Sequence, residues 1–133
     1  MWMASDAGGV VHTTSEDGVN WSALQRVGID GTPWHLNVAY VEGASQYWML
    51  FVDSPLAGSR LKLATSEDGL AWDIHPTPLL APGSGWDDER IYRASFLYDD
   101  GRLRVWYSAR SSAGQWHVGY SEAMKRDLDL PGG

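Results

Sequence analysis

Two predicted β-strands carry the side chains that could bind a ligand. The first covers residues 34–40 and the second covers residues 90–97. A purely structural strand would be richer in valine and isoleucine, whereas these two are rich in polar, charged and aromatic groups. Such groups suit the hydroxyls or a carboxylate of a bound molecule. The candidate ligand-binding residues are His35, Asn37, Arg90, Tyr92 and Arg93.

Strand alternation predicts how these side chains are oriented. Successive residues of a strand point to opposite faces, so His35 and Asn37 share one face of the first strand. Arg90 and Tyr92 share one face of the second strand, and Arg93 lies on the other. The alternative is structural: His35 is then a hydrogen-bonded residue of the sheet, and Arg93 pairs with an acid of a neighbouring sheet.

Two adjacent carboxylates, Asp88 and Glu89, precede the second strand. They are the candidate catalytic acids, because proton transfer needs a titratable group at the mouth of a site. The alternative is that both are solvated loop carboxylates with no chemical role.

The sequence has no motif for a metal site, a phosphate site, a catalytic serine or a dinucleotide. The four histidines (His12, His35, His75 and His117) show no metal-ligand spacing, and there is no cysteine. No phosphate-binding loop, nucleophile elbow or dinucleotide fingerprint is present. The sequence therefore predicts neither a metal nor a cofactor.

Composition narrows the class of protein. A net charge of −7 disfavours nucleic acid as a partner, since binding the phosphate backbone needs a basic surface. No apolar run is long enough to span a bilayer, so no membrane partner is expected. Residues 1–6 lack the basic start and apolar stretch of a signal peptide. We expect a soluble protein, and the composition does not indicate its compartment.

A repeated phrase sets the architecture. Thr-Ser-Glu-Asp-Gly-Val-Asn-Trp at 14–21 returns as Thr-Ser-Glu-Asp-Gly-Leu-Ala-Trp at 65–72. Repeats of this length that end in a turn and a tryptophan indicate stacked β-sheet units, the blades of a β-propeller. Glycine supplies the positive φ of the turn, the serine or aspartate closes it, and the tryptophan should pack between sheets. This role is structural, so we place no chemistry there.

Alignment on the phrase predicts an all-β chain of about ten strands in antiparallel blades of four. The domain runs from 1 to 127, with an incomplete blade at 1–29, a complete blade at 30–80 and a second incomplete blade at 81–122. Residues 122–127 form at most a short terminal turn, and residues 128–133 form a flexible tail. The hairpin between the runs at 90–97 and 102–108 is marked by the turn Asp99-Asp100-Gly101.

Two sets of residues carry a family resemblance. The Ser-x-Asp-Gly-x-x-Trp turns resemble those of five-bladed β-propeller glycosidases, and their spacing approximates the Asp-box of sialidases. The segments Gly-Trp-Asp-Asp-Glu-Arg-Ile-Tyr-Arg-Ala-Ser-Phe at 85–96 and Arg-Val-Trp-Tyr-Ser-Ala at 104–109 resemble the same enzymes. These are the arabinanase and xylosidase group, the invertase and levanase group and the mannoside phosphorylases.

The resemblance implies a site on the propeller axis. These families use three carboxylates brought from separate blades, and a chain of two and a half blades is expected to lack at least one. The first strand of each blade lies nearest the axis, which places the five candidate ligand contacts around a central funnel.

Three functions follow as hypotheses. The first is a carbohydrate-binding or glycosidase-like propeller fragment without independent catalytic activity. The second is a structural or protein-interaction module that assembles as a homo-oligomeric propeller. The third is a glycoside hydrolase active only as an oligomer. We expect a homo-oligomer, most simply a dimer, because an incomplete propeller exposes apolar sheet faces and unpaired edges.

Overall fold

A computed structural model describes residues 1–128, and within them the protein is all-β. Ten strands and two single-turn 3₁₀ helices, η1 (Glu42–Ala44) and η2 (Lys125–Asp127), account for the regular structure. The all-β fold predicted from the repeat is confirmed. Across the described residues, no helix has the length and apolar character needed to cross a membrane.

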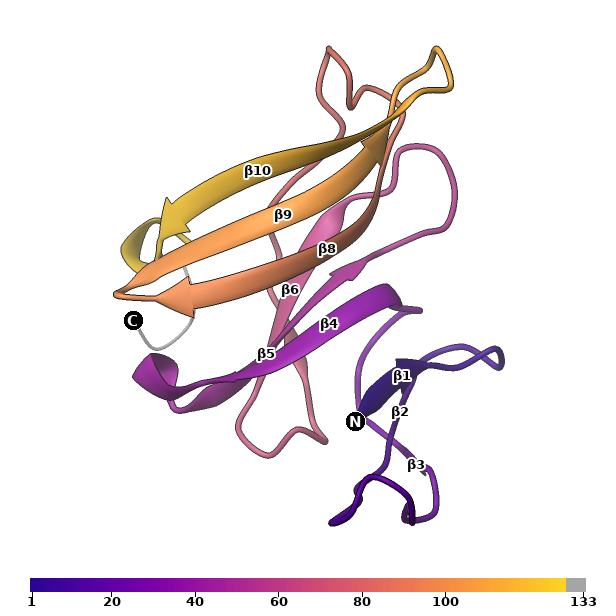
Figure 1. The fold of residues 1–133 in the computed structure, drawn as a ribbon, viewed down its shortest axis with the longest axis vertical. Coiled ribbons are helices and arrows are strands. Elements are labelled where there is room, and N and C mark those ends of the chain that lie inside the picture. The colour runs from indigo at the N-terminus through magenta and orange to yellow at the C-terminus, as the bar shows by residue number, and fades with distance from the viewer. Residues whose placement is uncertain (129–133) are drawn as a thin grey trace.

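The strands form three antiparallel sheets that follow one another along the chain (Figure 1). Sheet 1 holds β1 (Trp2–Ala4), β2 (Val10–His12) and β3 (Gln25–Arg26). Sheet 2 holds β4 (Trp34–Val41), β5 (Gln46–Val52), β6 (Leu61–Ser66) and β7 (Asp73–Ile74). Sheet 3 holds β8 (Arg90–Asp99), β9 (Arg102–Arg110) and β10 (Trp116–Met124). In each sheet the strands are neighbours in sequence order, as hairpin connections require.

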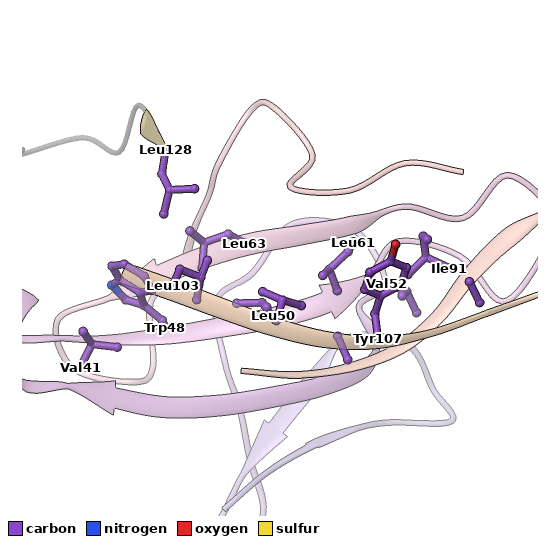
Figure 2. Close-up of a cluster of buried hydrophobic side chains, with 13 residues drawn as sticks. Val41, Trp48, Leu50, Val52, Leu61, Leu63, Ile91, Leu103, Tyr107 and Leu128 are labelled. Atoms are coloured by element: carbon purple, nitrogen blue, oxygen red, sulfur yellow. The ribbon is translucent and has the colours of Figure 1, made fainter. Parts of the chain in front are cut away.

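Sheet 2 is covered on both faces. One face packs on sheet 3 through the core of Figure 2, where Leu50 and Leu63 are fully buried with Leu103 and Val105. The opposite face buries Met49, Phe51 and Ala64 against sheet 1, with Val10 in the same cluster. The first strands of sheets 2 and 3, β4 and β8, contact each other (Figure 1). The three sheets therefore pack one against the next in chain order.

The hairpin between β8 and β9 has the turn chemistry that its sequence predicts. Asp100 and Gly101 have φ of 49° and 72°, and the flanking pair is Asp99 with Arg102. A two-residue turn with positive φ at both positions matches the right-handed twist of the strands. The turn fixes the register of a nine-pair ladder that runs to Arg90 and Arg110.

The repeated phrase forms the same turn twice. Ser15 Oγ accepts the Gly18 N–H at 2.8 Å, and Asp17 Oδ1 accepts two further backbone N–H groups. Ser66 and Asp68 make the same bonds to Gly69, Leu70 and Ala71. We call residues 15–21 and 66–72 the first and second turn motifs.

The two motif tryptophans differ in burial. Trp72 is 7% exposed and packs between sheets 1 and 2, as predicted. Trp21 is 46% exposed, so the expectation that it also packs between sheets is wrong within the described structure. The reason is geometric: Trp72 has a sheet on its side of the turn and Trp21 has none.

The end of the described chain is partly buried. Leu128, which the sequence places in a flexible tail, is only 8% exposed and belongs to the core between sheets 2 and 3 (Figure 2). The η2 turn at residues 125–127 brings it there, consistent with the expected short terminal turn. The rest of that tail, residues 129–133, lies outside the described residues.

Candidate functional site

The starts of β4 and β8 are both irregular. In β4, Trp34 pairs with Val52 and Asn37 pairs with Leu50, so two residues stand opposite one. In β8 the register shifts between Ile91 and Arg93, which leaves Tyr92 as the extra residue. Bulges of this kind bend a strand and redirect side chains, and they are common next to binding sites.

The bulges overturn the simple alternation expected here. Tyr92 and Arg93, predicted on opposite faces of β8, both contact His35 of β4. His35 has φ of +47°, a left-handed conformation that is uncommon for a residue with a side chain. Such strain persists only where the surrounding structure holds it, and it is concentrated at functional sites.

Aromatic rings form a continuous row across this end of the two strands. The ring of Trp34 lies 5.3 Å from that of His35, His35 lies 4.4 Å from Tyr92, and Tyr92 lies 5.0 Å from Trp116. The two ends of the row are open, since Trp34 is 37% exposed and Trp116 is 51% exposed. An exposed ring face can cover the C–H face of a sugar. We call Trp34, His35, Tyr92 and Trp116 the aromatic row.

Arg93 fixes the protonation state of His35. The Arg93 guanidinium donates to His35 Nδ1 at 3.0 Å, and a guanidinium can only donate. Nδ1 therefore accepts, and the single proton of the neutral ring sits on Nε2. Nε2 is buried and has no hydrogen-bond partner among the described residues. Burial and then the charge of Arg93 lower the pKa of His35 below its ordinary value of 6.5, so the ring is neutral at pH 7.

Asn37 contacts β8 away from the row, whereas Arg90 lies beside Trp116. Asn37 Oδ1 accepts the backbone N–H of Phe96 at 3.4 Å, which ties β4 to β8. The Arg90 guanidinium lies 6.0 Å from the Trp116 ring and donates to the Pro55 carbonyl and to Glu89. Its Nε is buried without a partner among residues 1–128. All five sequence-predicted contacts thus lie at the adjoining strands β4 and β8.

The two candidate acids are engaged by neighbours. Glu89 accepts from Arg110 at 2.6 and 2.5 Å and from Arg90 at 3.1 Å. Partial burial raises the pKa of Glu89, but these bonds and charges outweigh it, and the net pKa is lowered. Asp88 accepts from the backbone and hydroxyl of Ser112, and these bonds lower its pKa as well. A general acid needs the opposite shift, so the geometry favours structural use of both carboxylates.

A hollow lies at the other end of β4 and β8. It has a volume of about 590 Å³ and is lined by the ends of β4 and β8 and by the turns at Glu42-Gly43 and Asp100-Gly101. None of the residues of the aromatic row lines it. We place the candidate site at the aromatic row, because strained backbone and unpartnered buried nitrogens occur there.

Sequence reasoning did not single out Trp34 and Trp116 as contacts. Both are the first residues of strands, and they join the site through ring contacts with His35 and Tyr92. The only sequence signal for these two contacts was a tryptophan at the start of a predicted strand. Among the residues described, no group of three or more His, Asp and Glu side chains is arranged to hold a metal ion.

Comparisons with known proteins find carbohydrate-active enzymes that resemble this chain. A curated relative, the A type blood N-acetyl-alpha-D-galactosamine deacetylase of Flavonifractor plautii, is 34% identical over 166 aligned residues. That alignment covers 89% of this chain and 22% of the relative. No family model matches the chain.

Comparison with solved structures also finds carbohydrate-active enzymes. The crystal structure of an N-acetylgalactosamine deacetylase from F. plautii, in complex with blood group B trisaccharide, superposes with a TM-score of 0.81 and 32% identity. The match covers 92% of this chain and 43% of that one, so this chain spans less than half of it. A glycoside hydrolase matches with a TM-score of 0.64 at 17% identity, over 86% of this chain and 35% of that chain. At that identity the likeness concerns the fold alone. The chain thus shares its fold with carbohydrate-active enzymes.

Proposed function

We propose that this chain is a carbohydrate-binding segment of a β-propeller, and that it binds sugar at the aromatic row. The single observation that carries the proposal is the row itself: ring faces open at both ends, flanked by Arg90 and Arg93, at the adjoining first strands of two sheets. Aromatic faces and charge-assisted donors are the two elements of sugar recognition. The three sheets act as the predicted blades, 1–29, 30–80 and 81–122.

The comparisons support the ligand class. The deacetylase that resembles this chain was crystallised with blood group B trisaccharide, and the curated relative acts on an N-acetyl-α-D-galactosamine of type A blood. Oligosaccharides with a terminal galactose or N-acetylgalactosamine are therefore the first ligands to test. Because the chain spans 22% of the curated relative, the activity of that whole enzyme is not carried over here.

Chemistry by the chain alone is not expected. The candidate acids Asp88 and Glu89 are held by Ser112 and by arginines, and their pKa values are lowered. Hydrolysis of a glycosidic bond needs two carboxylates at set separations, one of them protonated. We expect no hydrolysis of aryl glycosides, either by the isolated chain or by its oligomer. Turnover only at concentrations where the chain assembles would favour the oligomeric glycosidase instead.

The test is direct binding of blood group B trisaccharide and N-acetylgalactosamine, measured by calorimetry. Arg93→Ala should weaken binding by about 1.5–3 kcal/mol, the contribution of a hydrogen bond to a charged group. Trp116→Ala should weaken it as well, because it removes an exposed ring. The matched control is Arg126→Ala, since Arg126 is exposed and pairs only weakly with the adjacent Asp127.

The opposite outcome is equally clear. If neither sugar binds and Arg93→Ala lowers the unfolding midpoint in urea, Arg93 and His35 connect two sheets and have no role in recognition. The interaction-module function then replaces the carbohydrate function.

A further inference from the structure

Three strand ends of sheet 3 meet beside the Trp116 end of the aromatic row. Arg90 begins β8 and pairs with Arg110 at the end of β9, and Arg110 also pairs with Trp116 at the start of β10. Residues that stand directly opposite each other share one face of the sheet. The two guanidinium groups are therefore neighbours, and like charges in this arrangement repel unless an acid lies between them.

Glu89 is that acid. Its two carboxylate oxygens accept from Arg110 Nη1 at 2.6 and 2.5 Å, and Oε1 also accepts from Arg90 Nη2 at 3.1 Å. The side chain of Glu89 is 17% exposed, so these charge-assisted bonds are screened by water and salt less than those of an exposed ion pair. One carboxylate thus holds both arginines in place.

The guanidinium of Arg90 is held at two points. Nη2 donates to Glu89, and Nη1 donates to the Pro55 carbonyl at 3.0 Å. The guanidinium carbon lies 6.0 Å from the centre of the Trp116 ring, within the range of a cation–π contact. Arg90 therefore supports the Trp116 ring while its own orientation is fixed by a carboxylate and a carbonyl.

One of these two points belongs to the β5–β6 loop, residues 53–60, which is itself attached to the start of β8. The Gly58 N–H donates to the Glu89 carbonyl at 2.8 Å. Ser59 is 1% exposed, its hydroxyl donates to the Ile91 carbonyl, and its own carbonyl accepts the Ile91 N–H at 3.2 Å. The loop is thus a firm anchor for the guanidinium.

We propose that Glu89 is a positioning residue of the sugar site: it contacts no sugar and acts by holding Arg90 against Trp116. The inference rests on the proposed function for its ligand, an oligosaccharide with a terminal galactose or N-acetylgalactosamine. Without the carboxylate, repulsion from Arg110 moves the Arg90 guanidinium away from Trp116. The ring then gains freedom that sugar binding must remove, which lowers the affinity. The carboxylate that the sequence presents as a candidate acid serves recognition in this role.

The test is a double-mutant cycle between Glu89 and Trp116, with the affinity for blood group B trisaccharide and N-acetylgalactosamine measured by calorimetry. Glu89→Gln keeps the size of the side chain and removes its charge, and it should weaken binding about tenfold, a coupling of the size found between groups in contact. In the Trp116→Ala background the same substitution should weaken binding less than about twofold, because the ring through which Glu89 acts is absent. A residue that only stabilised the fold would lower the affinity equally in both backgrounds.

A second measurement needs no ligand, and it decides the matter if Trp116→Ala binds too weakly for the cycle. The indole N–H resonance of Trp116 is identified in the NMR spectrum by its absence from Trp116→Ala. It should shift in Glu89→Gln. The resonance of Trp72, whose indole donates to Gly69, should stay in place and shows that the variant is folded.

Two further variants complete the experiment. Arg90→Lys should also weaken binding, because an ammonium group lacks the fork that reaches Pro55 and Glu89 together. Glu122→Gln is the matched control: Glu122 pairs with Arg102 near the far end of β10, and its variant should bind like the wild type.

The outcomes separate this inference from the proposed function. Equal affinities of the wild type and Glu89→Gln, equal losses in both backgrounds, or an unmoved Trp116 resonance would each overturn the positioning role and leave the sugar function standing. A wild type that binds neither sugar would overturn the sugar function itself, and the positioning role with it.

Discussion

Trp2 and Trp72 donate their indole N–H groups to the same carbonyl oxygen, that of Gly69, at 2.7 and 3.0 Å. Trp72 closes its own turn motif in this way, and Trp2 attaches sheet 1 to sheet 2 through the same atom. A carbonyl oxygen has two lone pairs, so both bonds can form together. The second turn motif is therefore the junction between the two sheets, whereas Trp21 of the first turn motif is 46% exposed.

The two motif glycines should differ in their tolerance of alanine. Gly18 and Gly69 have the same φ of +75°, so each alanine variant incurs the left-handed strain of about 1–2 kcal/mol. Gly69→Ala also brings a Cβ to 2.8 Å from the Trp2 ring, and overpacking of this kind adds about 1–3 kcal/mol. Urea unfolding of the two alanine variants measures the difference. Equal losses of unfolding free energy in the two variants would show that the Trp2 ring moves aside without destabilising the fold.

The two motif tryptophans should differ more strongly. Trp72→Ala removes a side chain that is 7% exposed and should destabilise the fold by about 3–5 kcal/mol. Trp21→Ala removes a side chain that is 46% exposed and should change the free energy of unfolding by less than about 0.5 kcal/mol. Thermal unfolding followed by near-ultraviolet circular dichroism compares them. A large loss for Trp21→Ala would mean that Trp21 is covered in solution.

The carboxylate of the second turn motif should make stability depend on acid pH. Hydrogen bonds from the backbone of Ala71 and then Leu70 lower the pKa of Asp68 below its ordinary value of 3.8. A lowered folded-state pKa gives stability that is complete above the ordinary value and is lost as the pH falls through the lowered one. Asp68→Ala should therefore destabilise the protein most at neutral pH and progressively less in acid. Glu67→Ala, at the exposed neighbouring position, is the control for the loss of a carboxylate.

The strands were predictable because their signals are local. Apolar runs, Gly and Asp turn residues and the repeated phrase lie within a few residues of what they specify, and the predicted all-β fold is confirmed. The exposure of Trp21 was not predictable from such local signals. An identical turn buries its tryptophan in one place and exposes it in the other, since burial depends on which sheet lies alongside.

The contacts of the candidate site were predictable only as a set. Sequence placed all five residues on two adjoining strands, but the bulges decided which of them meet. A bulge in β4 depends on how this strand pairs with β5, which the sequence does not show directly. A glycine between Trp34 and Asn37 would have indicated a positive φ, but none is present. His35 adopts that conformation instead, and the Arg93 bond and the rings of Trp34 and Tyr92 lie around it.

The environment of His35, including the hydrogen bond from Arg93, gives this histidine a distinct titration. Burial and then the charge of Arg93 lower the pKa of His35 below 6.5, so the folded state takes up its proton less readily than the unfolded chain. The resulting stability is present above pH 6.5 and is lost as the pH falls through the lowered pKa. Proton NMR of the imidazole should show Nε2 protonated at neutral pH and a midpoint below 6.5. In Arg93→Ala the midpoint should move upward, because the positive neighbour is gone, whereas Arg126→Ala should leave it in place. A wild-type midpoint at or above the ordinary value would mean that Arg93 does not hold Nδ1 in solution, and the neutral imidazole would then lose its fixed place in the aromatic row.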